Sequence, residues 1–308
     1  MSRQYRQSHY QNFIIMDILS NIANGNANIE AIKTQLFDVQ LVQLHPNLEG
    51  FKSPDSYGVY KGTGGSALGV VGNVFEPTQP KILFDAFENC LYDTDCDMSK
   101  VEYKTLKEDK KIIFKAPIKT IGFRNLRGQM DESIIHLNVQ TGFDGKTSTT
   151  LFLSMHRLIC ANGMKGFATE FESKFKNTKN NVGKVNMLCE DVAKAIMQAE
   201  TLENGLIHLN KMEVKQADVD VYLKKVLGYN QKDFNELNTG KRNILNAINS
   251  SIALEFGRTG STLWGLVNGI THYTNHVAST KNRLDYLYND SGMKMNDLAQ
   301  KVAFEMAN

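Results

Sequence analysis

The feature that most constrains the fold is the stretch from Ser133 to Met164, SIIHLNVQTGFDGKTSTTLFLSMHRLICANGM. Apolar and polar side chains alternate over residues 135–140 and again over residues 148–156. A period of two is typical of a strand that packs one face and exposes the other. Between the two arms, Asp144-Gly145 supplies residues that tolerate positive φ in a tight hairpin turn. We therefore expect an antiparallel hairpin with one solvated face at the centre of the fold.

The segments before this hairpin alternate between helical and extended patterns. Residues 10–36 carry apolar residues at helical spacing and predict one or two helices with a break near residues 24–26. Residues 38–45 predict a strand, and residues 80–92 predict a helix with Pro80 in its first turn. We also expect a strand over residues 111–121, where apolar residues again alternate with polar ones.

Beyond Gly183 the apolar residues recur at helical spacing, and glycines separate the stripes. Residues 280–308 are expected to form a polar amphipathic tail suited to packing on a neighbour. The expected fold is therefore α+β, an antiparallel β-sheet core of hairpins with an N-terminal helical segment and a C-terminal all-helical half. The expected domains are 1–50 (N-terminal helical segment), 51–184 (antiparallel sheet core) and 185–308 (helical region).

The composition indicates a globular protein inside the cell. The chain has 308 residues and is 42% hydrophobic, which is enough for a substantial core. No run approaches the ~18 apolar residues of a membrane span, and the polar start MSRQYRQSHYQN has no secretory apolar region. Four cysteines lack C-x-x-C spacing, so we expect small buried thiols rather than bridges or zinc ligands: Cys90, Cys96, Cys160 and Cys189.

Charge is distributed unevenly along the chain. The net charge is only +2, which does not indicate a globally basic protein. Residues 100–127 nevertheless contain nine basic and three acidic residues, whereas residues 190–236 contain nine acidic and six basic ones. A basic sheet region and a mildly acidic helical region could meet between subunits. The pattern therefore predicts a homo-oligomer, with a ring or a filament as possible forms.

Three lysines on one side of the predicted strand 111–121 form the strongest candidate for a binding surface. In an extended strand this lysine row, Lys111, Lys115 and Lys119, faces away from Ile112, Phe114, Ala116 and Ile118. The lysines then recur every ~13 Å, which suits alternate phosphates of an extended nucleic-acid strand. The alternative is a solvated sheet face that uses lysine to discourage edge pairing.

Arg157 needs a separate explanation, because its parity along the strand matches Leu151 and Met155 and directs it to the packed side. A buried guanidinium must find carboxylates or several carbonyl oxygens. Either Arg157 is a structural clamp at the end of the sheet, or the strand bends and Arg157 reaches a ligand. Asn162-Gly163 is expected to begin a helix whose first amides are available to a phosphate.

Two motifs resemble a known family. The hairpin followed by Arg157-x-x-Cys160-x-Asn162-Gly163, and upstream LGVVGNVFEP at residues 68–77, resemble the phage/plasmid-like family known as domain of unknown function 932. Phe75 stands where a tyrosine is expected, and the resemblance covers residues 56–190, with a further similar segment at residues 262–273. It implies a phage- or plasmid-encoded protein in the cytoplasm of a bacterial host. By fold analogy, hairpins followed by a helix are also similar to Rad-type single-strand annealing proteins.

Three other patterns are weaker candidates for a site. The Gly62–Ser66 loop does not close with Gly-Lys-Ser/Thr, so we reject a nucleotide-binding loop. Asp93, Asp95 and Asp97 imitate the start of a calcium loop but lack its later glycine and glutamate, which favours a solvated turn. The pair His272 and His276 is half of a zinc site without further ligands, so solvated or core-edge histidines are favoured.

No catalytic triad, carboxylate pair, nucleotide loop or metal cluster emerges, so the sequence favours a non-enzymatic protein without a cofactor or metal. The leading function is single-stranded DNA binding and annealing in recombination or replication, with no membrane partner. The alternatives are a protein-binding module, such as an inhibitor of a host defence system, and a metal-dependent nuclease. Nine residues are expected to contact nucleic acid: Lys104, Lys107, Lys111, Lys115, Lys119, Arg124, Arg127, Arg157 and Lys165. Two aromatic residues are expected to stack on bases: Tyr103 and Phe123.

Overall fold

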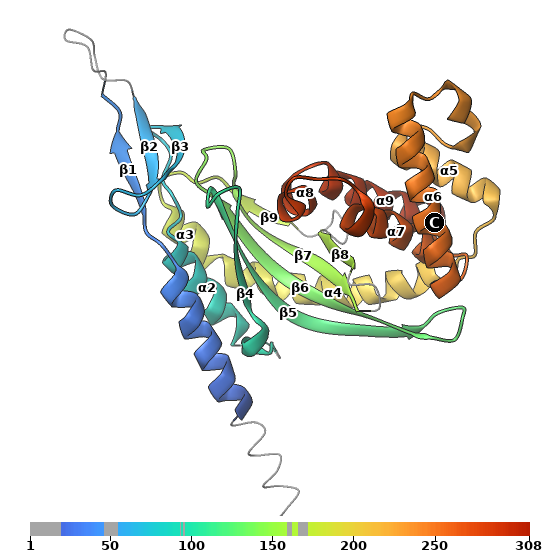
Figure 1. The fold of residues 1–308 in the computed structure, drawn as a ribbon. Helices are drawn as coiled ribbons and strands as arrows, with labels where there is room; N and C mark the ends of the chain where they lie inside the picture. The colour runs from blue at the N-terminus through green and yellow to red at the C-terminus, as the bar shows by residue number, and fades with distance from the viewer. Residues whose placement is uncertain (1–19, 46–54, 93, 95, 159–161, 166–171) are drawn as a thin grey trace, which may run out of the picture. The chain divides into compact units, whose positions relative to one another are not determined.

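A computed structural model describes residues 20–45, 55–92, 94, 96–158, 162–165 and 172–308 (Figure 1). The fold is α+β, with antiparallel sheets followed by C-terminal helices. This confirms the expected class, including the helical N-terminal segment and the helical C-terminal half. One sheet has the strand order β1-β2-β3, and the other has the order β4-β5-β6-β7-β8 with β9 paired to β7.

The strands have the following bounds: β1 Val39–Gln43, β2 Ser56–Lys61, β3 Ala67–Gly72, β4 Glu102–Leu106, β5 Lys111–Arg124, β6 Met130–Gly142, β7 Thr149–Arg157, β8 Asn162–Lys165 and β9 Glu172–Phe175. The α-helices have these bounds: α2 Pro80–Leu91, α3 Asn181–Asn186, α4 Leu188–Lys211, α5 Gln216–Leu227, α6 Thr239–Thr259, α7 Leu263–His272, α8 Arg283–Asn289 and α9 Ser291–Ala307. Residues 20–35 are also helical. Shorter turns of helix are η1 Met98–Lys100, η2 Gln231–Glu236 and the π-helical η3 Tyr273–Val277.

The chain forms two compact units that are interleaved along the sequence. The first unit comprises Met1–Ile118, Asn138–Leu151 and Lys174–Val192, and the second comprises Lys119–Leu137, Phe152–Ser173 and Ala193–Asn308. The three consecutive segments expected from the sequence stay a prediction. The long strands β5, β6 and β7 each pass from one unit to the other, since each crosses a unit boundary.

The first unit packs α2 against β5. The Phe114 ring lies 4.9 Å from that of Phe84 and 6.3 Å from that of Phe87, both on the buried side of α2. The N-terminal helix runs alongside α2 (Figure 1), and Lys33 Nζ is 3.0 Å from Glu88 Oε2. This helix is continuous from residue 20 to residue 35, so the expected break near residues 24–26 is wrong. Packing outweighs the weak helix propensity of its asparagine and glycine residues.

The Asp-Gly turn between β6 and β7 is present but longer than a two-residue hairpin, because β6 ends at Gly142 and β7 begins at Thr149. Asp144 Oδ1 accepts hydrogen bonds from the amides of Lys146 (3.0 Å) and Thr147 (2.8 Å), which closes the loop. The loop lies close to β3: a Cβ added at Gly69 would stand 2.9 Å from Asp144 Cα. Glycine is therefore required at position 69 for the loop to approach β3.

The expectation of one solvated face on β6 is wrong. Its polar residues His136, Asn138 and Gln140 are buried, like the apolar residues Ile135 and Leu137 between them. Alternation of side-chain type therefore marks two different buried faces here, one apolar and one polar. A local pattern cannot reveal this, because polar side chains that find partners in the fold are stable inside it.

A buried polar network joins four elements of the first unit. The Asn177 side-chain amide donates to Thr141 Oγ1 (3.2 Å), Gly142 O (3.0 Å) and Thr147 O (3.2 Å). Its carbonyl oxygen accepts from Thr149 Oγ1 at 2.7 Å and from Thr78 Oγ1 at 3.2 Å. Asn177 therefore fixes the β6–β7 loop to the segment that precedes α2.

The second unit contains the helices from Ala193 onward. The apolar helix α7 begins with the cap Thr262, whose hydroxyl accepts from Gly265 N at 3.1 Å, and it is buried over its whole length except His272. Tyr222 of α5 donates to Ala299 O of α9 at 3.1 Å. Ala299, Val302 and Ala303 of α9 are buried, so this part of the C-terminal segment packs within the chain. No helix in the described ranges is long and apolar enough to cross a membrane.

Two other sequence expectations are corrected by the fold. Asn162-Gly163 begins the strand β8 rather than a helix, because residues 162–165 pair with β7 in the register Arg157↔Asn162. Cys90 forms a disulfide bond, so the expected free thiol is wrong at that position. Cys96 is a free thiol whose pKa is raised to about 12 by burial. Cys160 and the side chain of Cys189 lie outside the described residues.

Candidate nucleic-acid interface

The turn between β5 and β6 is held in one conformation by Asn125. Its side-chain oxygen accepts from Arg127 N at 2.9 Å and from Gln129 N at 3.1 Å. Its main-chain amide donates to Gln129 O at 3.0 Å, and Gly128 closes the turn with φ +75°. A buried asparagine that bonds to its own turn makes this geometry largely independent of a ligand.

The same turn is anchored to helices of the second unit. Asn125 Nδ2 donates to Arg258 O near the end of α6 at 3.2 Å, and Asn210 Nδ2 of α4 donates to Arg124 O at 3.1 Å. Leu126 lies close to Gly260, where an added Cβ would stand 2.8 Å from Leu126 Cβ. The hairpin end is therefore fixed to α4 and α6 by the Asn125 side chain and the Arg124 carbonyl, while the side chains of Arg124 and Arg127 remain on the surface.

Four exposed side chains of this turn form what we call the tip surface: Arg124, Leu126, Arg127 and Met130. Leu126 and Met130 are each 48% exposed, which is high for large apolar residues. Arg124 Nη1 donates to Gly128 O at 3.0 Å. Neither arginine forms an ion pair with an acidic side chain in the described part of the chain. The tip surface thus combines two available guanidinium groups with two apolar side chains.

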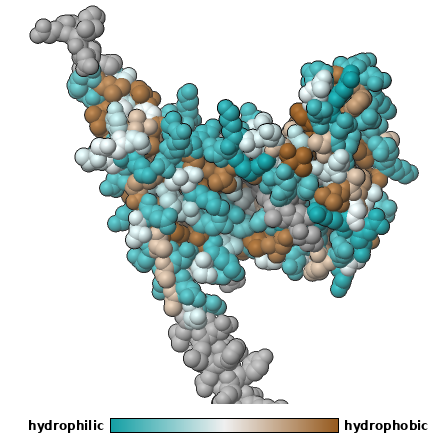
Figure 2. All heavy atoms as spheres, viewed as in Figure 1, coloured by the Kyte–Doolittle hydropathy of each residue, from teal (hydrophilic) through white to brown (hydrophobic). Residues whose placement is uncertain are grey.

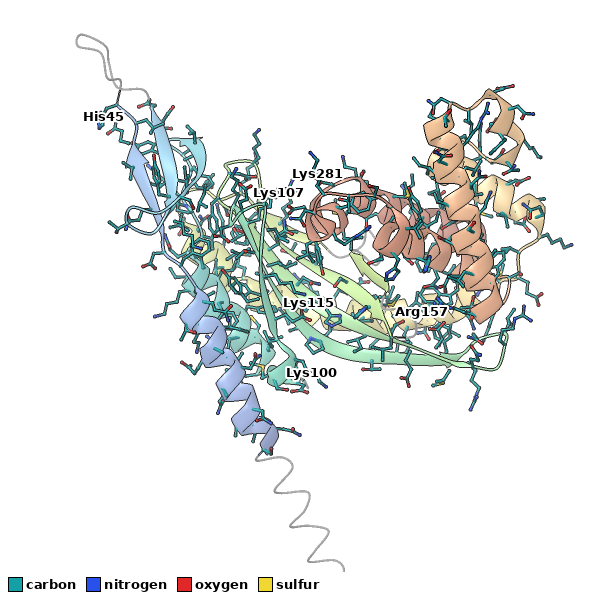
Figure 3. The ribbon with its side chains drawn as sticks, viewed as in Figure 1. His45, Lys100, Lys107, Lys115, Arg157 and Lys281 are labelled. Carbon is teal, nitrogen blue, oxygen red and sulfur yellow. The ribbon has the colours of Figure 1, made fainter. Side chains whose placement is uncertain are left out.

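The lysine row is less available than the sequence predicts. Lys115 Nζ lies 3.5 Å from Glu102 Oε1, its side chain is only 14% exposed, and burial lowers its pKa (Figure 3). Lys119 Nζ lies 2.8 Å from Glu203 Oε2. Lys111 is half-buried and engaged in other interactions. A phosphate would have to compete with these carboxylates, which weakens each contact.

The other predicted lysines lie in β4, in the β4–β5 turn and in β8. Lys104 is paired with Glu102, and Lys107 lies in the β4–β5 turn with φ +52° (Figure 3). The following residues Glu108 and Asp109 also have positive φ, and Asp109 pairs with Lys61 at 2.6 Å. Lys165 belongs to β8, but its side chain lies outside the described residues. Glu102 pairs with both Lys104 and Lys115, so the structure brings Lys104 next to the lysine row, but both lysines share that carboxylate.

The two predicted base-stacking rings are used in packing. The Tyr103 ring stacks on Phe114 at 5.4 Å, and burial raises the pKa of its phenol. Phe123 is 8% exposed and meets the Trp264 ring edge-on at 6.0 Å. Phe123 therefore does not present a ring face to a base in this structure.

Arg157 is the structural clamp of the two alternatives, since its side chain is 0% exposed (Figure 3). Its Nε and Nη2 donate to the two carboxylate oxygens of Asp131, both at 2.6 Å, and its Nη1 donates to Glu255 Oε2 at 2.6 Å. Trp264 Nε1 donates to Asp131 Oδ2 at 3.0 Å. We call these four residues the Arg157 cluster, and it joins β6 and β7 to α6 and α7.

The Arg157 cluster extends to the surface through Arg258, whose Nη1 donates to Glu255 Oε1 at 2.8 Å. The charges of Arg157 and Arg258 balance those of Asp131 and Glu255, which is the condition for burying ionised groups at tolerable cost. Because its guanidinium is fully buried and paired with two carboxylates, Arg157 is not accessible to a phosphate. The sequence alone did not reveal Glu255 as its partner on α6.

Neither weak metal candidate forms a site in the described residues, where no group of three or more His, Cys, Asp and Glu side chains is found. Asp97 Oδ1 accepts from Ser99 N at 3.1 Å and caps η1, while Asp93 and Asp95 lie outside the description. The His272 and His276 rings are 5.2 Å apart. His272 Nδ1 lies 3.1 Å from Ser251 Oγ, and burial lowers the pKa of His272.

These features define an α+β protein with an antiparallel sheet, a helical C-terminal half and a preorganised basic hairpin turn. Residues 67–297 match the family described as domain of unknown function (DUF932). The match spans most of the chain, so the protein belongs to this family, and it reaches further toward the C-terminus than the sequence resemblance indicated. No curated protein and no solved structure matches this chain.

Sequence reasoning selected Arg124 and Arg127 by charge but missed the residues that make them a surface. Asn125 and Gly128 are spaced as in a turn with a side-chain cap, and this signal was present in the sequence. The exposure of Leu126 and Met130 had no such signal, because isolated apolar residues near a turn are usually packed.

Proposed function

We propose that this protein binds single-stranded nucleic acid through the tip surface without catalysing a reaction on it. The observation that carries the proposal is the exposure of Arg124 and Arg127, without ion pairs to the described acidic residues, on a turn fixed by Asn125. Guanidinium groups bind phosphate oxygens through paired donors and need no further charge. Because the turn is already ordered, little conformational entropy is lost when a strand binds.

The apolar side chains explain why a single strand is the preferred ligand. In the proposed complex, Leu126 and Met130 contact the faces of unpaired bases, which a duplex hides in its stack. The arginines hold the backbone and leave base edges free, so a second strand can test complementarity. Annealing of complementary strands by a homo-oligomer in recombination or replication, as in Rad-type annealing proteins, is the process that this mode of binding would serve.

The lysine row has a secondary part in this proposal. Lys115 and Lys119 would have to exchange their carboxylate partners Glu102 and Glu203 for phosphates, which makes their net contribution small. The main electrostatic contribution therefore comes from the tip surface.

The test is fluorescence anisotropy with labelled oligo(dT) of about 30 nucleotides, titrated at salt concentrations from about 50 to 200 mM. Replacing Arg124 and Arg127 together with alanine should reduce the slope of log affinity against log salt by about 1.4, since each single-strand phosphate contact contributes about 0.7. Changing Lys232 and Lys281 to alanine is the matched control, because both are exposed and the same charge is lost.

The comparison separates specific contacts from net charge. The control should keep the wild-type slope, and both variants should give the wild-type circular dichroism spectrum. Equal slopes for the folded tip variant and the wild-type protein would refute the proposal, as would failure of the wild-type protein to bind oligo(dT) at low salt.

A further inference from the structure

The strand β1 is an edge of the three-stranded sheet in the first unit. Asp38 O and Leu44 N are hydrogen-bonded toward β2, at 2.7 and 3.0 Å. In an antiparallel ladder the amides alternate between the two sides of a strand. Val39, Leu41 and Gln43 therefore direct their N–H and C=O groups away from β2, toward the open side of the sheet.

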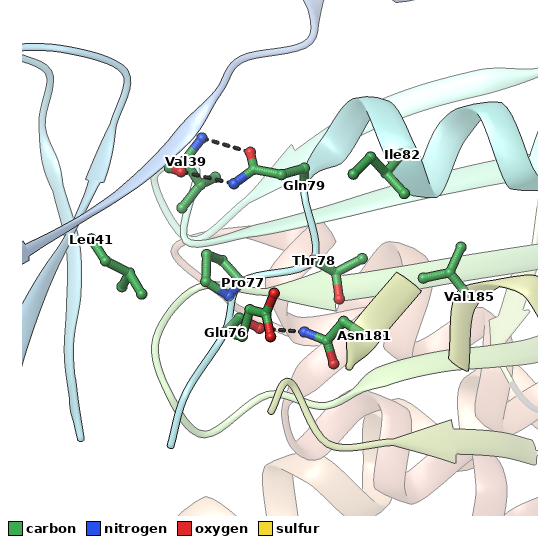
Figure 4. A pocket seen from close by; sticks show the side chains of 9 residues that line it. All are labelled: Val39, Leu41, Glu76, Pro77, Thr78, Gln79, Ile82, Asn181 and Val185. Atoms are coloured by element: carbon green, nitrogen blue, oxygen red, sulfur yellow. Dashed lines mark hydrogen bonds between the residues drawn. The ribbon is translucent and has the colours of Figure 1, made fainter. Parts of the chain in front are cut away.

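The first position of this edge is already paired in the manner of a neighbouring strand. The Gln79 side-chain amide accepts from Val39 N at 3.0 Å and donates to Val39 O at 2.8 Å (Figure 4). This is the pair of bonds that a residue of a fourth strand would make. No hydrogen bond to the outward amides of Leu41 and Gln43 is found within the described chain. Gln79 thus marks where a further strand would begin. It leaves the outward amides of Leu41 and Gln43 available to that strand.

A pocket of about 270 Å³ lies beside this edge (Figure 4). Val39 and Leu41 of β1 line it together with Ile82 of α2 and Val185 near the end of α3. Its volume is below the roughly 300–1,000 Å³ of pockets for drug-sized ligands, and suits one large apolar side chain. Hydrophobic residues also gather over the β1–β3 sheet in Figure 2, where Val42 is 49% and Val70 is 64% exposed.

Charge favours a peptide over a nucleic acid at this edge. Glu76 is the one titratable residue among those that line the pocket, and it is exposed. Its carboxylate repels phosphate groups and attracts lysine or arginine. The open backbone edge, the apolar pocket and the carboxylate are the three elements by which proteins recognise an extended peptide that adds to a sheet.

We propose that β1 binds an extended segment of a partner protein as a fourth strand, with an aliphatic or aromatic side chain in the pocket and a basic residue near Glu76. The main-chain bonds to Leu41 and Gln43 supply affinity that does not depend on the peptide sequence, and the pocket supplies the selection. This site is separate from the tip surface and does not depend on nucleic-acid binding.

The experiment uses the full chain and a set of fluorescein-labelled peptides with the pattern Thr-Lys-Thr-X-Thr-Lys-Thr. X is alanine, valine, isoleucine, leucine, methionine or phenylalanine, and a second set has glutamate in place of lysine. Fluorescence anisotropy should show that a large apolar X binds about tenfold more tightly than alanine, the factor expected for burying a few methylene groups. The lysine set should bind more tightly than the glutamate set.

Two variants test the backbone edge and the charge. Gln43→Pro removes an outward N–H that β2 does not use and should weaken peptide binding about tenfold, whereas Gln43→Ala, which keeps the N–H, should not. Glu76→Lys should reverse the preference between the lysine and glutamate sets. Binding to oligo(dT) should be the same in Gln43→Pro and in the wild-type protein.

Three results would overturn this proposal. They are the absence of binding to every peptide of both sets, equal affinities for Gln43→Pro and Gln43→Ala, and a concentration-dependent dimer in light scattering that Gln43→Pro abolishes. The last result would identify a second copy of the chain as the occupant of the edge.

Discussion

Removing Asp131 should destabilise the second unit more than any single surface change. Asp131 is 1% exposed and accepts two hydrogen bonds from Arg157 and one from Trp264. The change Asp131→Ala leaves the Arg157 guanidinium buried with Glu255 as its remaining described carboxylate. It also leaves the buried Trp264 N–H without the carboxylate that accepts its hydrogen bond.

The expected cost follows from these two losses. Breaking a buried ion pair by removing one partner costs about 3–5 kcal/mol, because the other charge remains desolvated. A buried donor that loses its acceptor adds about 1–3 kcal/mol. Relaxation and entry of water reduce the sum, so we expect a loss of about 4 kcal/mol in the free energy of unfolding. Such a loss is a large part of the ~5–15 kcal/mol that stabilises a typical domain.

Trp264 makes the measurement specific, because it is the only tryptophan in the chain and belongs to the Arg157 cluster. Its fluorescence during urea unfolding reports on the second unit alone. Glu132→Ala is the matched control, since Glu132 is the neighbouring residue, has the same charge type and is exposed. If Asp131→Ala costs less than about 1 kcal/mol while the control is neutral, the cluster does not stabilise the fold in the way argued here.

Replacing the whole lysine row by alanine should lower the salt slope of oligo(dT) binding by less than the value of about 2 expected for three free phosphate contacts, and a full loss of 2 would contradict the pairing with Glu102 and Glu203. Burial lowers the folded-state pKa of His272, so the unfolded state binds more protons and the free energy of unfolding should fall as pH drops below about 6.5. In urea unfolding measured across this pH range, His272→Gln should lack the part of the decrease that comes from His272. Asn177→Asp should lower the free energy of unfolding by at least about 3 kcal/mol, because a carboxylate would face the carbonyl oxygens of Gly142 and Thr147. Thermal melts followed by circular dichroism should show no such loss for the control Asn180→Asp, because Asn180 is exposed.

Much of the secondary structure could be predicted from the sequence. Alternation located β6 and β7, and helical spacing located α2 and the helices from α4 to α7. These patterns are local, because an element must bury one face whatever it packs against. The parity of Arg157 also predicted correctly that its side chain points inward, and the requirement for carboxylate partners followed from that.

The candidate site was predictable only in part, for a reason that the lysine row illustrates. Lys119 would be free if strand position alone decided its surroundings, but its partner Glu203 lies on a helix far along the chain. Asn162-Gly163 likewise has the composition of a helix start, yet pairing with Arg157 makes it a strand. In the first case a distant segment supplies the ion partner. In the second, pairing with the preceding strand outweighs the local preference, which amounts to less than about 1 kcal/mol per residue.

The sequence by itself determined the α+β class, the positions of β1, β5, β6, β7 and most helices, the family resemblance and the basic character of residues 100–127. Only the tertiary structure decided which charges remain on the surface. It buried the polar face of β6, paired Lys115 and Lys119 with acidic residues, enclosed Arg157 between Asp131 and Glu255, and left Arg124 and Arg127 exposed on a fixed turn. The physical reason is that charge type is a property of one residue, whereas burial and ion pairing depend on which distant segments the fold brings together.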